Sequence, residues 1–172
     1  LKCLTRMQNE GLSPDEVTFT CVIKACTHGG LTNEVQMLLA DMSKGYSIAP
    51  SLEHHTSMVT SFGYGGHFDK AMEVMEALPS SDHIELWIAL LGACRKWGNV
   101  KLGKMAFDQV LQIDNTFSGA YVLMANLFSV TGMHEDAHKV ESMRLKYAAS
   151  EVQENNVDID GRGNLYWIDR YF

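Results

Sequence analysis

Apolar and ring-bearing side chains recur with helical spacing in four stretches of the chain. Within each stretch they stand at i, i+3, i+4 and i+7, which places them on one face of an α-helix. The four sets are Phe19, Val22, Ile23 and Cys26; His55, Met58, Val59 and Phe62; Trp87, Leu90, Leu91 and Cys94; and Tyr121, Met124, Ala125 and Phe128. The pattern predicts four amphipathic helices of similar length.

A glycine follows each stripe after four residues, at Gly30, Gly66, Gly98 and Gly132. We expect each glycine to end its helix in left-handed backbone, which costs other residues more. A second stripe opens beyond each glycine. These sets are Val35, Leu38, Leu39 and Met42; Phe68, Ala71, Met72 and Met75; Gly103, Ala106, Phe107 and Val110; and Met133, Ala137, Val140 and Met143. Each unit therefore reads as a pair of helices.

The units recur with a period near 34 residues. The first side chains of the four leading stripes, Phe19, His55, Trp87 and Tyr121, are separated by 36, 32 and 34 residues. A helical hairpin cannot bury its stripes alone, so hairpins of this kind stack on one another. The sequence predicts an all-α solenoid of about four helix-turn-helix repeats, with no strands.

Composition narrows the class of protein. A formal net charge of −7 over 172 residues argues against binding polyanions by bulk charge, although a local basic strip stays compatible with it. No apolar run reaches the roughly 18 residues of a membrane span, and the first residues do not resemble a signal peptide. We therefore expect no membrane partner.

The cysteines show no metal-ligand spacing. We expect Cys3, Cys21, Cys26 and Cys94 to be buried free thiols, as suits a reducing compartment. No cofactor and no metal site is predicted.

The two ends of the chain depart from the period. Residues 1–15 read as the second half of a repeat that began upstream. Residues 148–172 carry no stripe and read as a diverged, loop-rich tail. Its last segment, NLYWIDRYF, fits either a short strand or a docking segment.

The repeats resemble those of pentatricopeptide-repeat (PPR) proteins of the plant-type PLS subclass. The segments that carry the resemblance include PSLEHHTSMV, LWIALLGACRKWGNV and SGAYVLMANLFSVTGMHEDAHKVESM. The related tetratricopeptide pattern needs Trp, Leu-Gly and Tyr at places where the first two copies lack them. The resemblance implies a long PPR repeat at 16–50, a short PPR repeat at 51–82, a first E motif at 83–116 and a second E motif at 117–147.

The resemblance also implies a fold and a function. It implies a right-handed solenoid in an organelle, with mitochondrion favoured over chloroplast, whose repeats bind single-stranded RNA at one base per repeat. The E motifs would contact protein partners in C-to-U RNA editing. The chain has no CxxC of the deaminase type, so we expect no enzyme here. Either a deaminase is recruited in trans, which we favour, or the catalytic part lies outside this chain. The alternative is a structural subunit of an organellar ribosome or another large complex, without base reading.

The residues that read bases in the family map onto the first two copies. The first reader of each pair falls on Thr20 and Thr56. The second falls on Ser51 in copy one and on Asp82, or Ser81 one residue earlier, in copy two. Val17 and Glu53 match the position that flanks the base, where Val17 suits stacking and Glu53 is a poor neighbour for phosphate. The alternative is that both threonines are ordinary solvated helix residues.

The equivalent positions in copies three and four are Ile88 and Val122. Neither side chain can donate or accept a hydrogen bond, so neither can interrogate a base edge. Base reading is therefore predicted to stop after copy two.

Two other patterns suggest chemistry and have simpler explanations. His134, Glu135 and His138 spell an HExxH zinc-protease motif, but Asp136 inside it and the lack of a third ligand favour a polar helix start. His54, His55 and His67 cluster in sequence; His55 fills a ring position of the stripe, so we expect it in the core.

The methionines fall mostly on or beside the stripes and read as core. A partner groove formed by Met105, Met124 or Met143 is the minor alternative.

Overall fold

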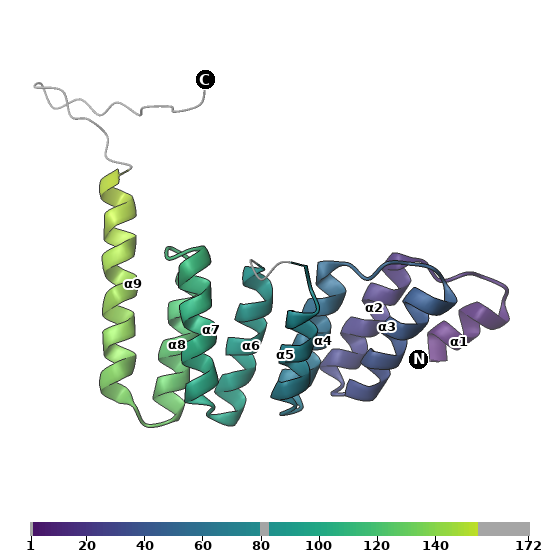
Figure 1. The fold of residues 1–172 in the computed structure, drawn as a ribbon, viewed down its shortest axis with the longest axis horizontal. Helices are drawn as coiled ribbons and strands as arrows, with labels where there is room; N and C mark the ends of the chain where they lie inside the picture. The colour runs from purple at the N-terminus through teal and green to yellow at the C-terminus, as the bar shows by residue number, and fades with distance from the viewer. Residues whose placement is uncertain (1, 80–82, 155–172) are drawn as a thin grey trace, which may run out of the picture.

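The computed structural model describes residues 2–79 and 83–154, and within these ranges the chain is built from helices alone (Figure 1). The helices are α1 (Lys2–Asn9), α2 (Glu16–His28), α3 (Thr32–Gly45), α4 (Leu52–Tyr64), α5 (Phe68–Glu76), α6 (Ile84–Trp97), α7 (Val100–Ile113), α8 (Ser118–Val130) and α9 (His134–Glu154). The predicted all-α class is confirmed.

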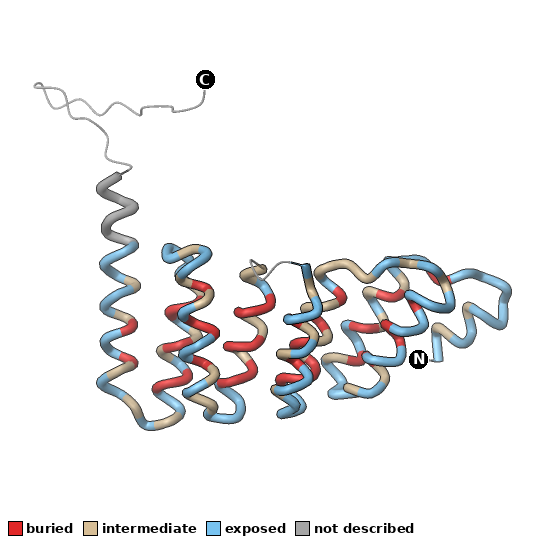
Figure 2. The backbone as a smooth tube through the Cα atoms, in the orientation of Figure 1, coloured by how far each residue is buried: buried red, intermediate tan, exposed pale blue. Residues whose placement is uncertain are grey.

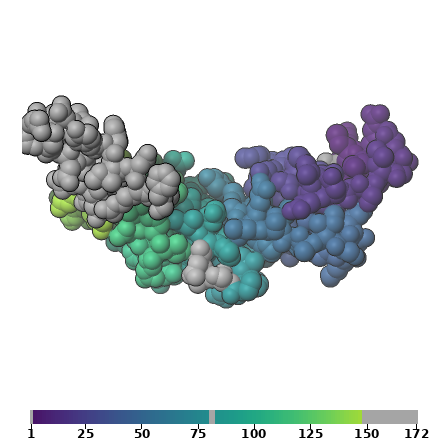
Figure 3. All heavy atoms as spheres, turned by 90° about the horizontal axis from the view of Figure 1, so that it is seen from above, coloured from purple at the N-terminus to yellow at the C-terminus, as the bar shows by residue number. Residues whose placement is uncertain are grey.

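The helices pair into hairpins that stack side by side. Each of α2, α4, α6 and α8 packs on the helix that follows it. In addition, α2 packs on α4, α4 on α6 and α6 on α8, so the four form a continuous row. We call them the first helices and their partners α3, α5, α7 and α9 the second helices. Seen from above, the stack is bent (Figure 3). The molecule is therefore a helical-repeat solenoid, as the period predicts.

The core follows the predicted stripes along the interior of the stack (Figure 2). Phe19, Val59, Leu90 and Tyr121, one from each first helix, are fully buried. The first repeat has its own apolar cluster and the other three share a larger one, with Met58 packed against both. Burial of these stripes is the main stabilising term, at about 1.5–3 kcal/mol for each large side chain.

The four glycines predicted to end the first helices all have left-handed backbone. Their φ angles are 69° at Gly30, 82° at Gly66, 63° at Gly98 and 77° at Gly132. At each turn a backbone amide bonds back to a carbonyl of the preceding helix; Leu31 N, for example, donates to Cys26 O over 2.9 Å. These bonds satisfy helix ends that would otherwise lack partners.

Two predictions about the chain need correction. The predicted loop is wrong for residues 148–154, because α9 continues to Glu154; residues 155–172, including NLYWIDRYF, lie outside the described residues. The cysteines are free, but only Cys26 and Cys94 are buried, whereas Cys3 and Cys21 are exposed. Cys21 lies two residues after Phe19, the first residue of the stripe, and so points off the buried face of α2.

No helix within residues 2–79 and 83–154 combines the length and the apolar character needed to cross a bilayer.

Candidate functional site

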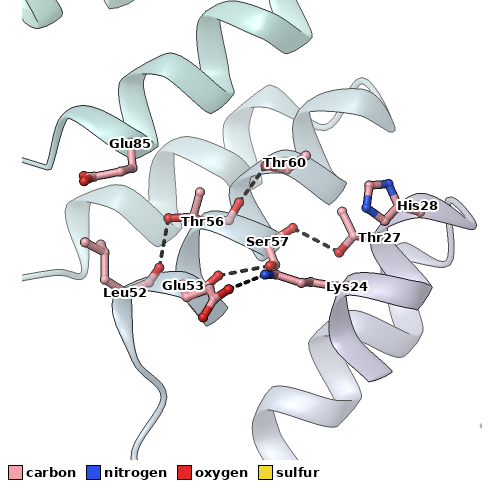
Figure 4. A pocket seen from close by; sticks show the side chains of 9 residues that line it. All are labelled: Lys24, Thr27, His28, Leu52, Glu53, Thr56, Ser57, Thr60 and Glu85. Atoms are coloured by element: carbon pink, nitrogen blue, oxygen red, sulfur yellow. Dashed lines mark hydrogen bonds and ion pairs between the residues drawn. The ribbon is translucent and has the colours of Figure 1, made fainter. Parts of the chain in front are cut away.

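A groove of about 670 Å³ lies between α2 and α4 and reaches the start of α6 (Figure 4). Its walls come from the first helices, so it opens on the face formed by their row. The lining residues are Lys24, Thr27, His28, Leu52, Glu53, Thr56, Ser57, Thr60 and Glu85. We call it the first-helix groove.

Thr56, a predicted base reader, lies in the wall of this groove (Figure 4). Its hydroxyl donates to the carbonyl of Leu52 over 2.9 Å, and the hydroxyl of Thr60 donates to the carbonyl of Thr56 over 2.7 Å. A threonine that donates its only proton to its own helix still has oxygen lone pairs for an outside donor. The wall therefore offers hydrogen-bond acceptors to a ligand.

One ion pair crosses the groove floor. Lys24 of α2 pairs with Glu53 of α4, and about half of each side chain is exposed. Because Lys24 donates to this carboxylate, the pKa of Glu53 lies below its usual value, so the residue is ionised at neutral pH. Glu85 adds a second carboxylate at the rim. The groove is thus not basic overall, and Lys24 is largely neutralised.

A second groove of about 600 Å³ continues from the first, sharing Thr27, His28 and Thr60 with it. Its far end carries Lys96 and the exposed ring of Trp97, and its lining residues include no Asp or Glu. Lys96 Nζ donates to the carbonyl of Tyr64 over 2.8 Å and lies 5.3 Å from the Trp97 ring centroid. A cation beside an exposed ring is a surface suited to stacking.

Lys96 and Trp97 were not among the predicted site residues. They come two and three residues after Cys94, which ends the stripe of the third copy. An aromatic residue just beyond the end of an apolar stripe was the available signal.

Thr20, the other predicted first reader, is held by a histidine of the next repeat. Its Oγ1 lies 3.0 Å from Nε2 of His54 and donates to the carbonyl of Glu16, also over 3.0 Å. His54 is only 1% exposed. On the other side of the ring, Ser51 reaches Nδ1 with both its backbone N, at 3.1 Å, and its Oγ, at 2.7 Å. The two predicted readers of copy one are therefore linked through one buried imidazole.

This arrangement determines where the proton of His54 lies. A backbone amide can only donate, so Nδ1, which faces the amide of Ser51, carries a lone pair. The neutral ring then has its proton on Nε2, which donates to Thr20. Burial lowers the pKa of His54 below its usual value, and this favours the neutral ring. The bond to Ser51 also closes a capping box at the start of α4.

The remaining predicted readers fall in different surroundings. Val17 is 67% exposed on α2, and Ser51 is half-buried as the N-cap of α4. Asp82 and Ser81 lie outside the described residues. The structure thus links Thr20 with Ser51, and it places Thr56 alone in the first-helix groove.

The histidine expected in the core is only half-buried. His55 Nδ1 lies 2.9 Å from the carbonyl of Ser51, whereas the neighbouring His54 is the fully buried ring. The expectation for His55 is confirmed for its hydrogen-bonded ring nitrogen, but it is wrong for the burial of the side chain. His67 is exposed at the N-cap of α5.

The HExxH segment forms the first turns of α9. His134, Glu135 and His138 are all exposed, and Asp136 bonds to Lys139 over 3.1 Å. Within residues 2–79 and 83–154, no three His, Cys, Asp or Glu side chains gather as a metal site would require.

The three methionines suggested for a partner groove lie in different surroundings. Met105 lines a groove of about 500 Å³ between α5 and α7, together with Met72 and Phe68. Met143 is exposed on α9, but Met124 is buried, so the suggestion is wrong for Met124.

Comparison with known proteins places these features in a family. A model described as the pentacotripeptide-repeat region of PRORP matches residues 1–113, and a model described as the E motif matches residues 97–153. The second match begins later than the first E motif expected from residue 83.

Curated plant proteins match between 81% and 98% of the chain. Pentatricopeptide repeat-containing protein At4g14820 of Arabidopsis thaliana is 34% identical over 98% of this chain, and At4g16470 of the same plant is 40% identical over 81%. A third, At2g22410, whose name includes "mitochondrial", is 31% identical over 90% of the chain. The chain spans only 23% to 28% of the length of these relatives.

Proposed function

The chain belongs to the pentatricopeptide-repeat family, and on this premise we propose that it is a non-catalytic module that binds single-stranded RNA and carries protein contacts. The whole protein would act in a plant organelle. The mitochondrion is favoured because several relatives, At2g22410 among them, carry that word in their names, and the chloroplast is the alternative.

The observation that carries the proposal is the position of Thr56 in the wall of the first-helix groove. A single strand laid along the row of first helices would present one base to each repeat. Thr56 would accept a hydrogen bond from a base edge, and Ser57 would supply a further polar contact. Two reading repeats yield only a few kcal/mol, at about 1–3 kcal/mol per stacked base, so this chain alone is expected to bind RNA weakly.

The repeats after copy two would serve a different purpose. Ile88 is half-buried and Val122 is exposed at the places where a reader would stand, and neither can recognise a base edge. The α7–α9 region matches the E motif. We propose that its hairpins hold a protein partner of a C-to-U editing assembly, with the deaminase supplied in trans.

One observation favours a second candidate. Two carboxylates, Glu53 and Glu85, line the first-helix groove, and acidic side chains repel a phosphate backbone. A structural subunit of an organellar ribosome or another large complex would use the curved stack as a scaffold without reading bases.

A selection from a random single-stranded RNA pool separates these functions. We expect the RNAs selected by the chain to share a base preference. This preference should change with Thr56→Asn and be lost with Thr56→Val. Thr60→Asn is the matched control, because Thr60 lines the same groove one turn away from the reading position. Binding without base preference, unaltered by either Thr56 variant, would favour the structural subunit.

A further inference from the structure

We propose that His54 is a positioning residue that presets Thr20 as a hydrogen-bond acceptor, so that copy one distinguishes amino bases from keto bases. The inference rests on the proposed function, because it concerns how the RNA-reading face selects a base. It assigns a role to a residue that touches no base itself.

The four hydrogen bonds around His54 run in one direction. The amide and hydroxyl of Ser51 donate to Nδ1, Nε2 donates to Thr20 Oγ1, and Thr20 Oγ1 donates to the carbonyl of Glu16. Hydrogen bonds that follow one another in this way polarise their neighbours, so each bond is strengthened. Turning the hydroxyl proton of Thr20 toward His54 would set it against the proton on Nε2 and leave that N–H without an acceptor. His54 is buried, and an unpaired polar group in a buried setting costs about 1–3 kcal/mol.

As a result, the hydroxyl of Thr20 can only accept a hydrogen bond from a ligand. Its only proton is committed to Glu16 and one lone pair is taken by His54, so a single lone pair stays available to a ligand. Thr20 is half-buried and therefore retains some exposure. Toward RNA it acts as an acceptor that demands an N–H from the base.

Copy two lacks this device. Within the described ranges the hydroxyl of Thr56 bonds only to the carbonyl of Leu52, and no imidazole donates to it. Its hydroxyl can rotate toward a base as donor or stay as acceptor. Thr56 is therefore the internal comparison for Thr20.

An acceptor of fixed polarity divides the four bases into two pairs. Facing the central ring nitrogen of the pairing edge, it accepts from the N–H of guanine or uracil and repels the lone pair of adenine or cytosine. Facing the exocyclic group, it accepts from the amine of adenine or cytosine and repels the carbonyl of guanine or uracil. In either register, discrimination lies between A and G and between C and U, independently of base size.

The test combines selection with variants of the 172-residue chain. A pool of random single-stranded RNA octamers is selected, and the positions read by copies one and two are identified by Thr20→Asn and Thr56→Asn. At the copy-one position we expect unequal A and G, and unequal C and U. His54→Leu should bring these ratios about two- to tenfold closer to one, the size of one hydrogen bond, and leave the copy-two position unchanged.

His54→Gln is the conservative control. Its amide can accept from Ser51 through oxygen and donate to Thr20 through nitrogen, and glutamine at this place also closes a capping box. We expect it to retain the discrimination. His55→Gln should also retain it, because His55 bonds only to the carbonyl of Ser51 within the described residues.

A second measurement needs no variant. In the ¹⁵N-labelled chain, the imidazole nitrogens of His54 report directly which one carries the proton. We expect a protonated Nε2 and an unprotonated Nδ1 at neutral pH. The opposite tautomer would overturn the proposal.

The failures are distinguishable. Equal A and G with equal C and U at the copy-one position, or a folded His54→Leu chain that keeps full discrimination, overturns the role of His54 alone. Loss of preference at both positions in His54→Leu points to a general structural effect and overturns it as well. If neither Thr20→Asn nor Thr56→Asn changes any preference, the proposed function itself fails.

Discussion

Gly63 of α4 lies directly against Ala93 of α6, so closely that a Cβ added to Gly63 would be 2.6 Å from the Cβ of Ala93. Both residues are buried on adjacent members of the first-helix row. The contact sets how closely copies two and three stack. It also sets the spacing of the groove walls, because α4 and α6 both contribute to them.

We expect Gly63→Ala to destabilise the chain by about 1–3 kcal/mol, as overpacking of a tight contact does. The measurement is the urea midpoint of unfolding followed by circular dichroism. Gly45→Ala is the matched control, because a Cβ at Gly45 meets nothing within 4 Å, and its change should stay within about 1 kcal/mol. Adding Ala93→Gly to Gly63→Ala should recover part of the loss. An additive loss in the double variant would contradict the contact.

His54 should make stability sensitive to mild acid. Burial lowers its folded-state pKa, an effect that Glu16 and Glu53 oppose and that His55 and Lys24 reinforce. In the unfolded chain this histidine has a pKa near 6.5. It therefore takes up a proton at a pH at which His54 in the folded chain is still neutral. The free energy of unfolding should be at its full value above pH 6.5 and fall as the pH drops below it.

The measurement for this prediction is the urea midpoint between pH 7.5 and 5. In His54→Gln that part of the slope should vanish. The lowered pKa values of Asp15, Glu53, Asp114 and Glu141 act in a more acidic window, which separates their contribution. An unchanged slope in His54→Gln would assign the acid sensitivity to other groups.

Glu53→Gln should strengthen RNA binding. The substitution removes a carboxylate from the groove and releases Lys24 from its ion pair. One further phosphate contact should steepen the dependence of log affinity on log salt by about 0.7. Titration of labelled single-stranded RNA at several salt concentrations measures both effects. Glu76→Gln is the control with the same charge change, because Glu76 lies on α5 and outside the groove lining. An equal effect of this variant would show that net charge, and not the groove, controls the affinity.

The four thiols should fall into two classes. Burial raises the pKa of Cys94 to about 12 and raises that of Cys26 as well, so both lack thiolate at neutral pH. Cys3 and Cys21 are exposed. A disulfide reagent should modify two thiols quickly in the native chain and all four in denaturant. Rapid reaction of Cys94 in the native chain would show that the core between α6 and its neighbours opens readily.

Sequence alone determined the repeat, its two helices and the turn between them. Apolar spacing within one helix and the left-handed preference of Gly30, Gly66, Gly98 and Gly132 are local properties, and local properties can be read from neighbouring letters. The loop expected from residue 148 began too early because the polar end of α9, which runs to Glu154, carries no stripe to mark it as helix.

Only the tertiary structure decided which polar side chains meet. His54 rather than His55 enters the core because the packing of α4 against α2 chooses the buried face, and periodicity fixes that face only to within a residue. The links from Thr20 to His54 and from Lys24 to Glu53 join residues about one repeat apart. Their distances depend on how closely successive helices stack, which small residues such as Gly63 and Ala93 control through contacts that no single helix contains.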